Sequence, residues 1–124
     1  MFEAFINRTL AYQVKNHIGL ITFSTQARVH QSITDVIEDF RNSVRYSTCH
    51  GDTALWDALA LARENLSGYA EKFPEVRKRI ICLSDGEDTK SLYSAQEVCL
   101  ALRVFPYTIS NHFLRKTISS WTLL

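Results

Sequence analysis

The sequence has little excess charge, few cysteines and no long apolar run. Its 124 residues carry a formal net charge of +1, which gives no electrostatic reason to bind nucleic acid or an acidic membrane surface. The three cysteines form no Cys-x-x-Cys pair, which disfavours a disulfide framework and fits a reducing compartment. No apolar run approaches the ~20 residues of a membrane span, and no signal-peptide pattern opens the chain. These absences predict a cytoplasmic or otherwise intracellular protein that binds neither nucleic acid nor membrane.

Motifs that carry catalysis are absent as well. Four scattered glycines cannot build a phosphate-binding loop, and neither G-x-S-x-G nor H-E-x-x-H occurs. Cys49 and His50 are sequence neighbours, which is poor geometry for a catalytic pair on one face. Cys82 is expected in the core and Cys99 in the core or half-buried. The sequence therefore predicts a protein that is not an enzyme, with one alternative described below.

Four segments show the apolar spacing of amphipathic helices. Three of them cover about residues 2–14, 35–46 and 54–69, and Gly68 is expected near the end of the third. The fourth begins at Ser94, because Ser94 and Glu97 have the spacing of a capping box. The third helix follows Asp52 and Thr53, and either side chain could cap its first turn.

Apolar runs rich in β-branched residues predict strands between these helices. "HIGLITFS" and "RIICLS" predict two buried strands, and "QARVHQSI" predicts an edge strand that turns back near Thr25 and Gln26. "RVFPYTIS" predicts a last strand, and Pro106, which has no N–H to donate to a neighbour, favours an edge or a bulge there. The tail "HFLRKTISSWTLL" has only weak helical periodicity. The alternation of helices and strands predicts an α/β layered sheet, whose ligands bind beyond the carboxyl ends of the strands.

Oxygen-bearing side chains gather at two of these expected strand and helix ends. Asp85 directly follows the strand "RIICLS", and Thr53 directly precedes the third helix. Hydroxyls and carboxylates suit a hard cation such as Mg²⁺. The residues alone leave two simpler roles open, a solvated turn for Asp85 and a helix N-cap for Thr53. Glu87 and Asp88 are expected to be solvated.

The order of three segments resembles the von Willebrand factor A-type domain. "HIGLITFST" corresponds to the family's second strand, "GDTALWDALALA" to its threonine loop and helix, and "RIICLSDGED" to its fourth strand and acidic loop. The resemblance covers about residues 2–110 and implies a three-layer, doubly wound, mostly parallel Rossmann-like sheet flanked by helices. It also implies a protein–protein interaction module with a metal-ion-dependent adhesion site for Mg²⁺ or Mn²⁺. By position, Thr53 and Asp85 match two metal-site residues, and an acidic side chain of a partner protein would complete the coordination.

The resemblance also indicates missing parts. The family's first strand ends in Asp-x-Ser-x-Ser and lies in the middle of the sheet, and this sequence contains no such motif. We therefore expect residues 1–124 to form a single incomplete domain, a fragment of a larger protein, with an incomplete site and no metal of its own. The alternative is a contracted sheet in which "GLITF" and "IICLS" pair directly.

One enzymatic reading remains as the alternative function. "IICLSDGEDT" superficially resembles the strand end of magnesium-dependent phosphatases that use an aspartate nucleophile, which would be Asp85. Those enzymes place a second aspartate two residues after the first. Here Glu87 occupies that position and Asp88 lies one residue further, so its side chain would turn away. The interaction module is therefore the preferred prediction.

Overall fold

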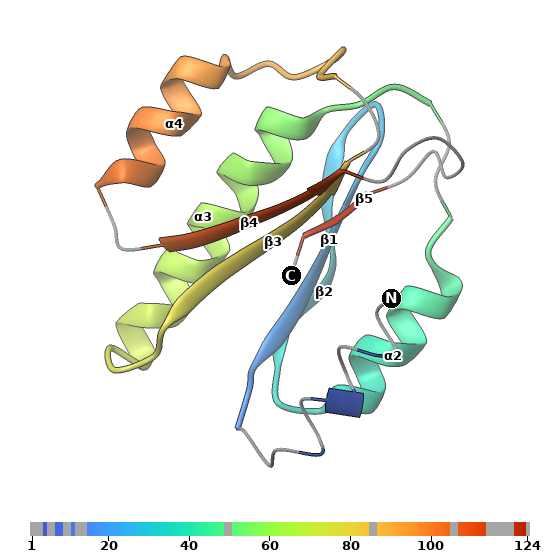
Figure 1. The fold of residues 1–124 in the computed structure, drawn as a ribbon, viewed down its shortest axis with the longest axis vertical. Coiled ribbons are helices and arrows are strands. Elements are labelled where there is room, and N and C mark those ends of the chain that lie inside the picture. The colour runs from blue at the N-terminus through green and yellow to red at the C-terminus, as the bar shows by residue number, and fades with distance from the viewer. Residues whose placement is uncertain are drawn as a thin grey trace.

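A five-stranded sheet with helices packed against it forms the fold (Figure 1). The computed structural model describes residues 4, 7–8, 11, 15–48, 51–84, 87–104, 107–113 and 121–123. The helix expected over residues 2–14 falls largely outside these ranges, although its four described residues are helical. The elements in chain order are β1 (Ile18–Phe23), β2 (Ala27–Thr34), α2 (Ile37–Tyr46), α3 (Leu55–Lys72), β3 (Lys78–Ser84), α4 (Ala95–Arg103), β4 (Tyr107–Phe113) and β5 (Trp121–Leu123).

The sheet is mixed, with the strand order β2-β1-β5-β3-β4. β1 and β2 form the predicted antiparallel hairpin, and β3 pairs in parallel with β4, which is the predicted last strand at the edge. β5 is antiparallel to both β1 and β3, so β1, β3 and β4 all run in one direction. The α/β class is confirmed. The prediction of a mostly parallel sheet is not, because three of the four pairings are antiparallel.

The centre of the sheet differs from both expected arrangements. β1 and β3 do not pair directly, but they share a neighbour, because β5 lies between them. Trp121, Thr122 and Leu123 pair with residues 21–23 of β1, and Leu123 also pairs with Cys82 of β3. Buried strands need partners for their backbone N–H and C=O groups, and this short aromatic and β-branched segment supplies part of that ladder. The weak helical periodicity of the tail does not match its described residues, because residues 112–113 end β4 and residues 121–123 form β5.

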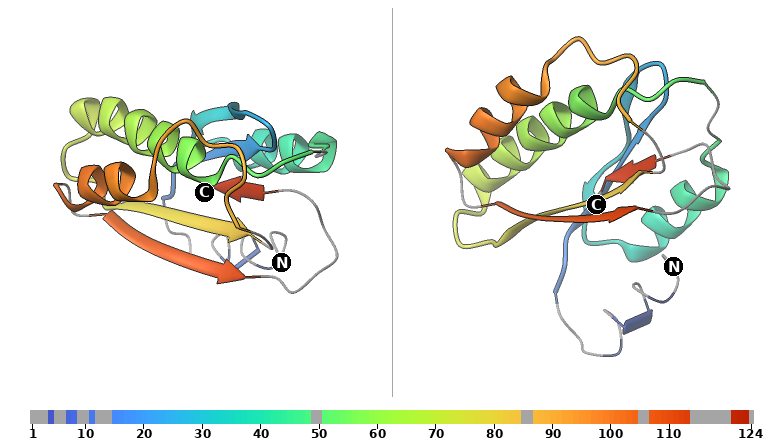
Figure 2. Two further views of the ribbon diagram at one scale, coloured as in Figure 1. Left: turned by 90° about the horizontal axis from the view of Figure 1, so that it is seen from above. Right: turned by 45° about the horizontal axis from the view of Figure 1, so that its top comes forward.

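The core lies on both faces of β1, as its alternating side chains dictate. Ile18 and Leu20 pack with Phe40 of α2, and all three are buried. Ile21 and Phe23 point the other way and join the larger cluster beneath α3 and α4. Figure 2 shows these two helices side by side on one side of the sheet. The further buried members of that cluster are Ala58, Leu59, Ala62, Ile80, Cys82, Leu83, Val98 and Leu102.

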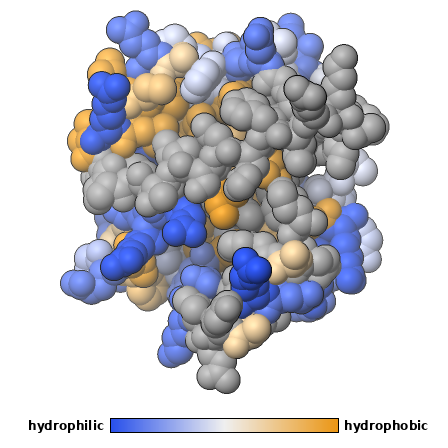
Figure 3. Space-filling view, in the orientation of Figure 1, coloured by the Kyte–Doolittle hydropathy of each residue, from blue (hydrophilic) through white to orange (hydrophobic). Residues whose placement is uncertain are grey.

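The described helices differ from prediction mainly at the carboxyl end of α3. α3 continues through Gly68 to Lys72, three residues beyond the predicted 69, because an interior glycine weakens a helix without ending it. α4 exposes Leu100 and Val104, and Figure 3 shows apolar surface over this helix at the upper left. No helix among the described ranges combines the length and apolar character needed to cross a lipid bilayer.

The predicted capping box begins α4. The Ser94 hydroxyl accepts a hydrogen bond from the Glu97 N–H at 3.3 Å, and the Glu97 carboxylate accepts one from the Ser94 N–H at 2.8 Å. The Ser94 hydroxyl also donates to this carboxylate, and these bonds hold the pKa of Glu97 below its usual value. A depressed carboxylate pKa stabilises the folded state above the unfolded pKa, and this contribution disappears as the pH falls through the folded pKa.

Ser94→Ala is therefore expected to raise the pKa of Glu97 toward its ordinary value and to lower the stability of α4 at neutral pH. NMR titration of the Glu97 carboxyl carbon measures the first effect, and amide exchange within α4 measures the second. Ser67→Ala, an equivalent change in α3, serves as the control. An unchanged Glu97 titration in Ser94→Ala would show that the box does not form.

Candidate functional site

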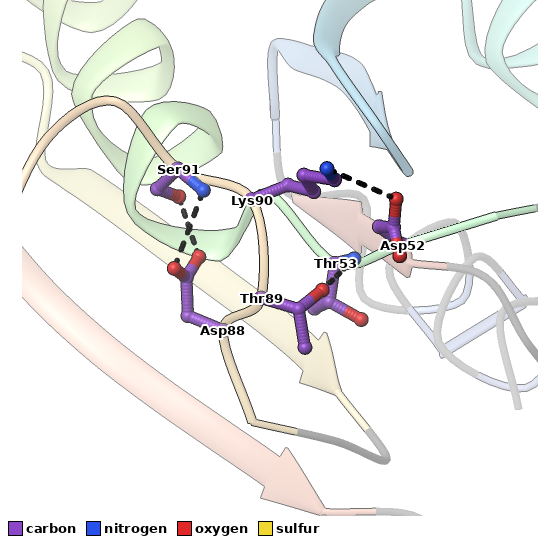
Figure 4. Close-up of polar contacts among 6 residues, drawn as sticks. All are labelled: Asp52, Thr53, Asp88, Thr89, Lys90 and Ser91. Atoms are coloured by element: carbon purple, nitrogen blue, oxygen red, sulfur yellow. Dashed lines mark hydrogen bonds and ion pairs between the residues drawn. The ribbon is translucent and has the colours of Figure 1, made fainter.

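Two loops meet at the carboxyl edge of the sheet (Figure 4). The first, here called the threonine loop, covers residues 51–54 before α3. The second, the acidic loop, follows β3 and is described from residue 87 to residue 91. The Thr53 N–H donates to the Thr89 hydroxyl at 2.9 Å, and the Thr53 carbonyl accepts from the Thr89 N–H at 2.8 Å and the Lys90 N–H at 3.3 Å. Both backbone groups of Thr53 are thus bonded to the acidic loop.

Asp88 caps α3 from the acidic loop. The N-cap residue of α3, Ala54, has no side-chain acceptor, and the first turn of a helix leaves its N–H groups without partners. Asp88 Oδ1 accepts from the Leu55 N–H at 2.8 Å and from the Trp56 N–H at 3.3 Å. Its negative charge also suits the positive end of the helix dipole. The prediction of a solvated Asp88 is therefore wrong, because the half-buried carboxylate does the capping that sequence analysis assigned to Thr53 or Asp52.

A second carboxylate, on α3, accepts hydrogen bonds from the segment that follows the acidic loop. Asp57, in the first turn of α3, accepts from the Leu92 N–H at 2.8 Å and the Tyr93 N–H at 3.0 Å. Ser91 lies between the two acids: its hydroxyl donates to Asp88 and accepts from the Asp57 N–H at 3.1 Å. The acidic loop and the start of α3 consequently form one hydrogen-bonded unit.

The threonine loop is also attached to β1. The Ala54 N–H donates to the Ser24 carbonyl at 2.8 Å. Gly51 adopts a φ of 108°, and a Cβ there would lie 2.8 Å from the Thr25 hydroxyl, so only glycine fits this turn. An ion pair of 4.0 Å joins Asp52 to Lys90, but both side chains are about half exposed and the pair contributes little.

The candidate metal ligands are only partly described. Thr53 is half-buried at the junction of the loops, and its hydroxyl makes no hydrogen bond to another described residue. Asp85 lies outside the described residues, so its assignment stays a prediction. Glu87 is exposed, as expected for a solvated side chain. Within the described ranges no three His, Cys, Asp or Glu residues gather in a way that could hold a metal ion.

Of the two cysteines that the structure describes, one is buried and one is exposed. Cys82 is buried in β3 as predicted, and burial raises the pKa of its thiol to about 11. Cys99 is exposed, so its predicted place in or near the core is wrong: it lies on α4 beside the buried Val98 but faces outward. Cys49 and His50 lie outside the described residues. Trp56 is partly buried and packs against the core.

Comparisons with known proteins identify a family and a relative of this chain. Residues 1–87 match the sequence model of the von Willebrand factor type A domain. A stretch of 93 residues is 38% identical to the "Probable bifunctional E2/E3 enzyme R795" of Acanthamoeba polyphaga mimivirus. That stretch covers 72% of this chain but only 7% of the viral protein. Because the family match extends over more than half of the sequence, the chain belongs to the von Willebrand factor type A domain family.

Proposed function

We propose that this chain is a protein-interaction module whose carboxyl edge contributes part of a Mg²⁺ or Mn²⁺ site. Thr53 and Asp85 would be two of its ligands, and a partner's acidic side chain would complete the coordination. The observation that supports the proposal is the pair of hydrogen bonds between Thr53 and Thr89, one from the Thr53 N–H to the Thr89 hydroxyl and one from the Thr89 N–H to the Thr53 carbonyl. They fix the threonine loop against the loop that contains Asp85, as a shared ion would require.

The donor set explains why the site would need a further segment. Mg²⁺ prefers near-octahedral oxygen coordination, and one hydroxyl with one carboxylate supplies too few protein ligands. The described residues therefore do not fit the ion by themselves. We propose that an Asp-x-Ser-x-Ser strand from outside these 124 residues supplies the other donors. In that complete domain the strand would replace β5 between β1 and β3 and run parallel to both, which gives the doubly wound sheet of the family.

Metal binding tests the proposal directly. A chain extended at Met1 by a strand and an Asp-x-Ser-x-Ser loop is expected to bind Mg²⁺ in calorimetric titration, while the unextended chain shows no saturable binding. In the extended chain, Thr53→Val keeps the side-chain shape but removes the hydroxyl, and should weaken Mg²⁺ binding at least about tenfold. Thr48→Val makes the same chemical change on an exposed residue outside the site and should have no effect. Equal Mg²⁺ affinity with and without the extension would contradict the proposal.

The viral relative is named an E2/E3 enzyme, but the matched stretch is a small part of that protein. We propose that the present chain binds partners and does not itself perform catalysis. A thiol with a pKa of about 11, as in Cys82, is a poor nucleophile at neutral pH.

The hydrolase alternative needs a mobile carboxylate beside Asp85. Asp88 does not suit that role, because its oxygens already accept four hydrogen bonds, from Leu55, Trp56 and two groups of Ser91. Glu87 is exposed and remains the only described candidate in that loop. Magnesium-dependent hydrolysis of a generic phosphoester that disappears in Asp85→Asn would favour the alternative over the interaction module.

A further inference from the structure

A groove of about 700 Å³ lies next to the threonine loop, between the outer half of the β1–β2 hairpin and the end of α2. Its walls include Thr22, Arg28 and His30 of the hairpin, and Tyr46 and Thr48 at the end of α2. A volume of this size is typical of a binding site for a small ligand or a short peptide segment.

The groove follows from the short length of α2. Ten residues of helix span about 15 Å, and Phe40 packs with Ile18 and Leu20 at the start of β1. On the same face of β1 the next residue is the polar Thr22. Thr22 and Arg28 are cross-strand partners, so their side chains project from the same face of the sheet. This is the face that α2 covers, but both residues lie beyond the end of that helix.

The lining has the charge of an anion-binding surface. Its described residues supply the Arg28 guanidinium, the His30 imidazole, hydroxyl groups and an amide, and none of them carries a carboxylate. The end of α2 would oppose an anion through its partial negative charge. That effect is reduced here, because Arg45 lies in the last turn and the Ser47 N–H and hydroxyl both donate to the Val44 carbonyl.

Two residues of the groove lining lie next to the threonine loop. Ser24 and Thr25 belong to its lining, and they contact Ala54 and Gly51 of the threonine loop. A partner peptide could therefore place one carboxylate at the candidate metal site beside Thr53 and its neighbouring residues in the groove beside Arg28.

We propose that this groove binds an acidic peptide segment of the partner protein, held by Arg28. The inference rests on the proposed interaction function and adds the chemistry of the partner. A nucleic acid fits less well, because the net charge is +1 and the described lining contains one arginine, whereas nucleic-acid surfaces carry clusters of basic residues.

Fluorescence anisotropy with a labelled peptide rich in Asp and Glu tests the proposal on the 124-residue chain. EDTA and low salt are used, so that the result does not depend on the metal site. The peptide should bind, and its Asn/Gln counterpart should bind far more weakly. Arg28→Glu replaces an attraction by a repulsion and should weaken binding about tenfold. Thr48→Glu, on the opposite wall, should produce a loss in the same direction.

Arg77→Glu is the matched control, because it makes the same charge change at an exposed site just before the amino end of β3, whereas the groove lies at the carboxyl end of β1. It should change the affinity by less than about twofold, as expected for a distant screened charge. Equal losses in Arg28→Glu and Arg77→Glu, or no binding of the acidic peptide, would overturn the proposal. So would a single-stranded oligonucleotide that binds the groove more tightly than the peptide. Failure of the Mg²⁺ titration alone would leave the groove result unaffected.

Discussion

Thr122→Pro is expected to lower the free energy of unfolding by about 3 kcal/mol or more, because proline inside a sheet removes a ladder hydrogen bond and strains the strand. Thr122 is the middle residue of β5 and pairs with Thr22 of β1 at the centre of the sheet. Small domains have a total stability of only ~5–15 kcal/mol, so this one change should remove a large part of it. Urea unfolding followed by circular dichroism measures the loss.

Thr122→Val is the control for this prediction, because it keeps the backbone N–H and the β-branched shape. Its effect should stay within about 0.5–1 kcal/mol. The two variants separate pairing of the β5 backbone from any other role of residue 122. If Thr122→Pro unfolds at the same urea concentration as the unmodified chain, β5 does not contribute to the sheet in solution.

Asp88→Ala is expected to cost about 2–3 kcal/mol, the combined effect of losing a helix cap and leaving partly buried N–H groups without partners. The affected donors are the N–H groups of Leu55, Trp56 and Ser91 and the Ser91 hydroxyl. Asp88→Asn keeps a side-chain oxygen for the first turn of α3 and should cost about half as much. Equilibrium urea unfolding ranks the variants.

Glu87→Ala provides the matched control, since it removes a neighbouring carboxylate that is exposed. An exposed substitution of this kind should change stability by no more than about 0.5 kcal/mol. Equal effects of Asp88→Ala and Glu87→Ala would mean that the cap on α3 is not formed by Asp88. Hydrogen exchange of the Leu55 and Trp56 amides in Asp88→Ala shows whether the loss of stability lies at the first turn of α3.

Local patterns in the sequence predicted most of the individual elements. The helical spacing of apolar residues predicted α2 and α3, and the capping-box spacing of Ser94 and Glu97 predicted the start of α4. The strand pattern gave β1 and β3, whose apolar side chains are buried, and β2, whose side chains are half-buried or exposed as expected for an edge strand. β5 could not be predicted in this way. Three residues are too few for a period to appear, and their place is fixed by the position between β1 and β3 that they fill.

The site was harder to predict because its contacts join distant parts of the chain. Asp88 and Leu55 are separated by 33 residues, and no local motif links an acid to a helix that begins so far upstream. A usable signal was present at Ala54: an apolar residue at an N-cap position implies that another segment must supply the acceptor. Thr53 is at the predicted edge of the sheet, beside the acidic loop, because the order of strands and helices fixes that edge.

Paramagnetic broadening by Mn²⁺ tests most directly whether the threonine and acidic loops form half of a cation site. In the chain extended by an Asp-x-Ser-x-Ser strand, substoichiometric Mn²⁺ should selectively broaden the amide signals of Thr53, Glu87 and Thr89. The amide of Lys78, at the opposite end of β3, should stay sharp, and the unextended chain should show no selective broadening. The same broadening in the unextended chain, or broadening centred away from Thr53, would contradict the account.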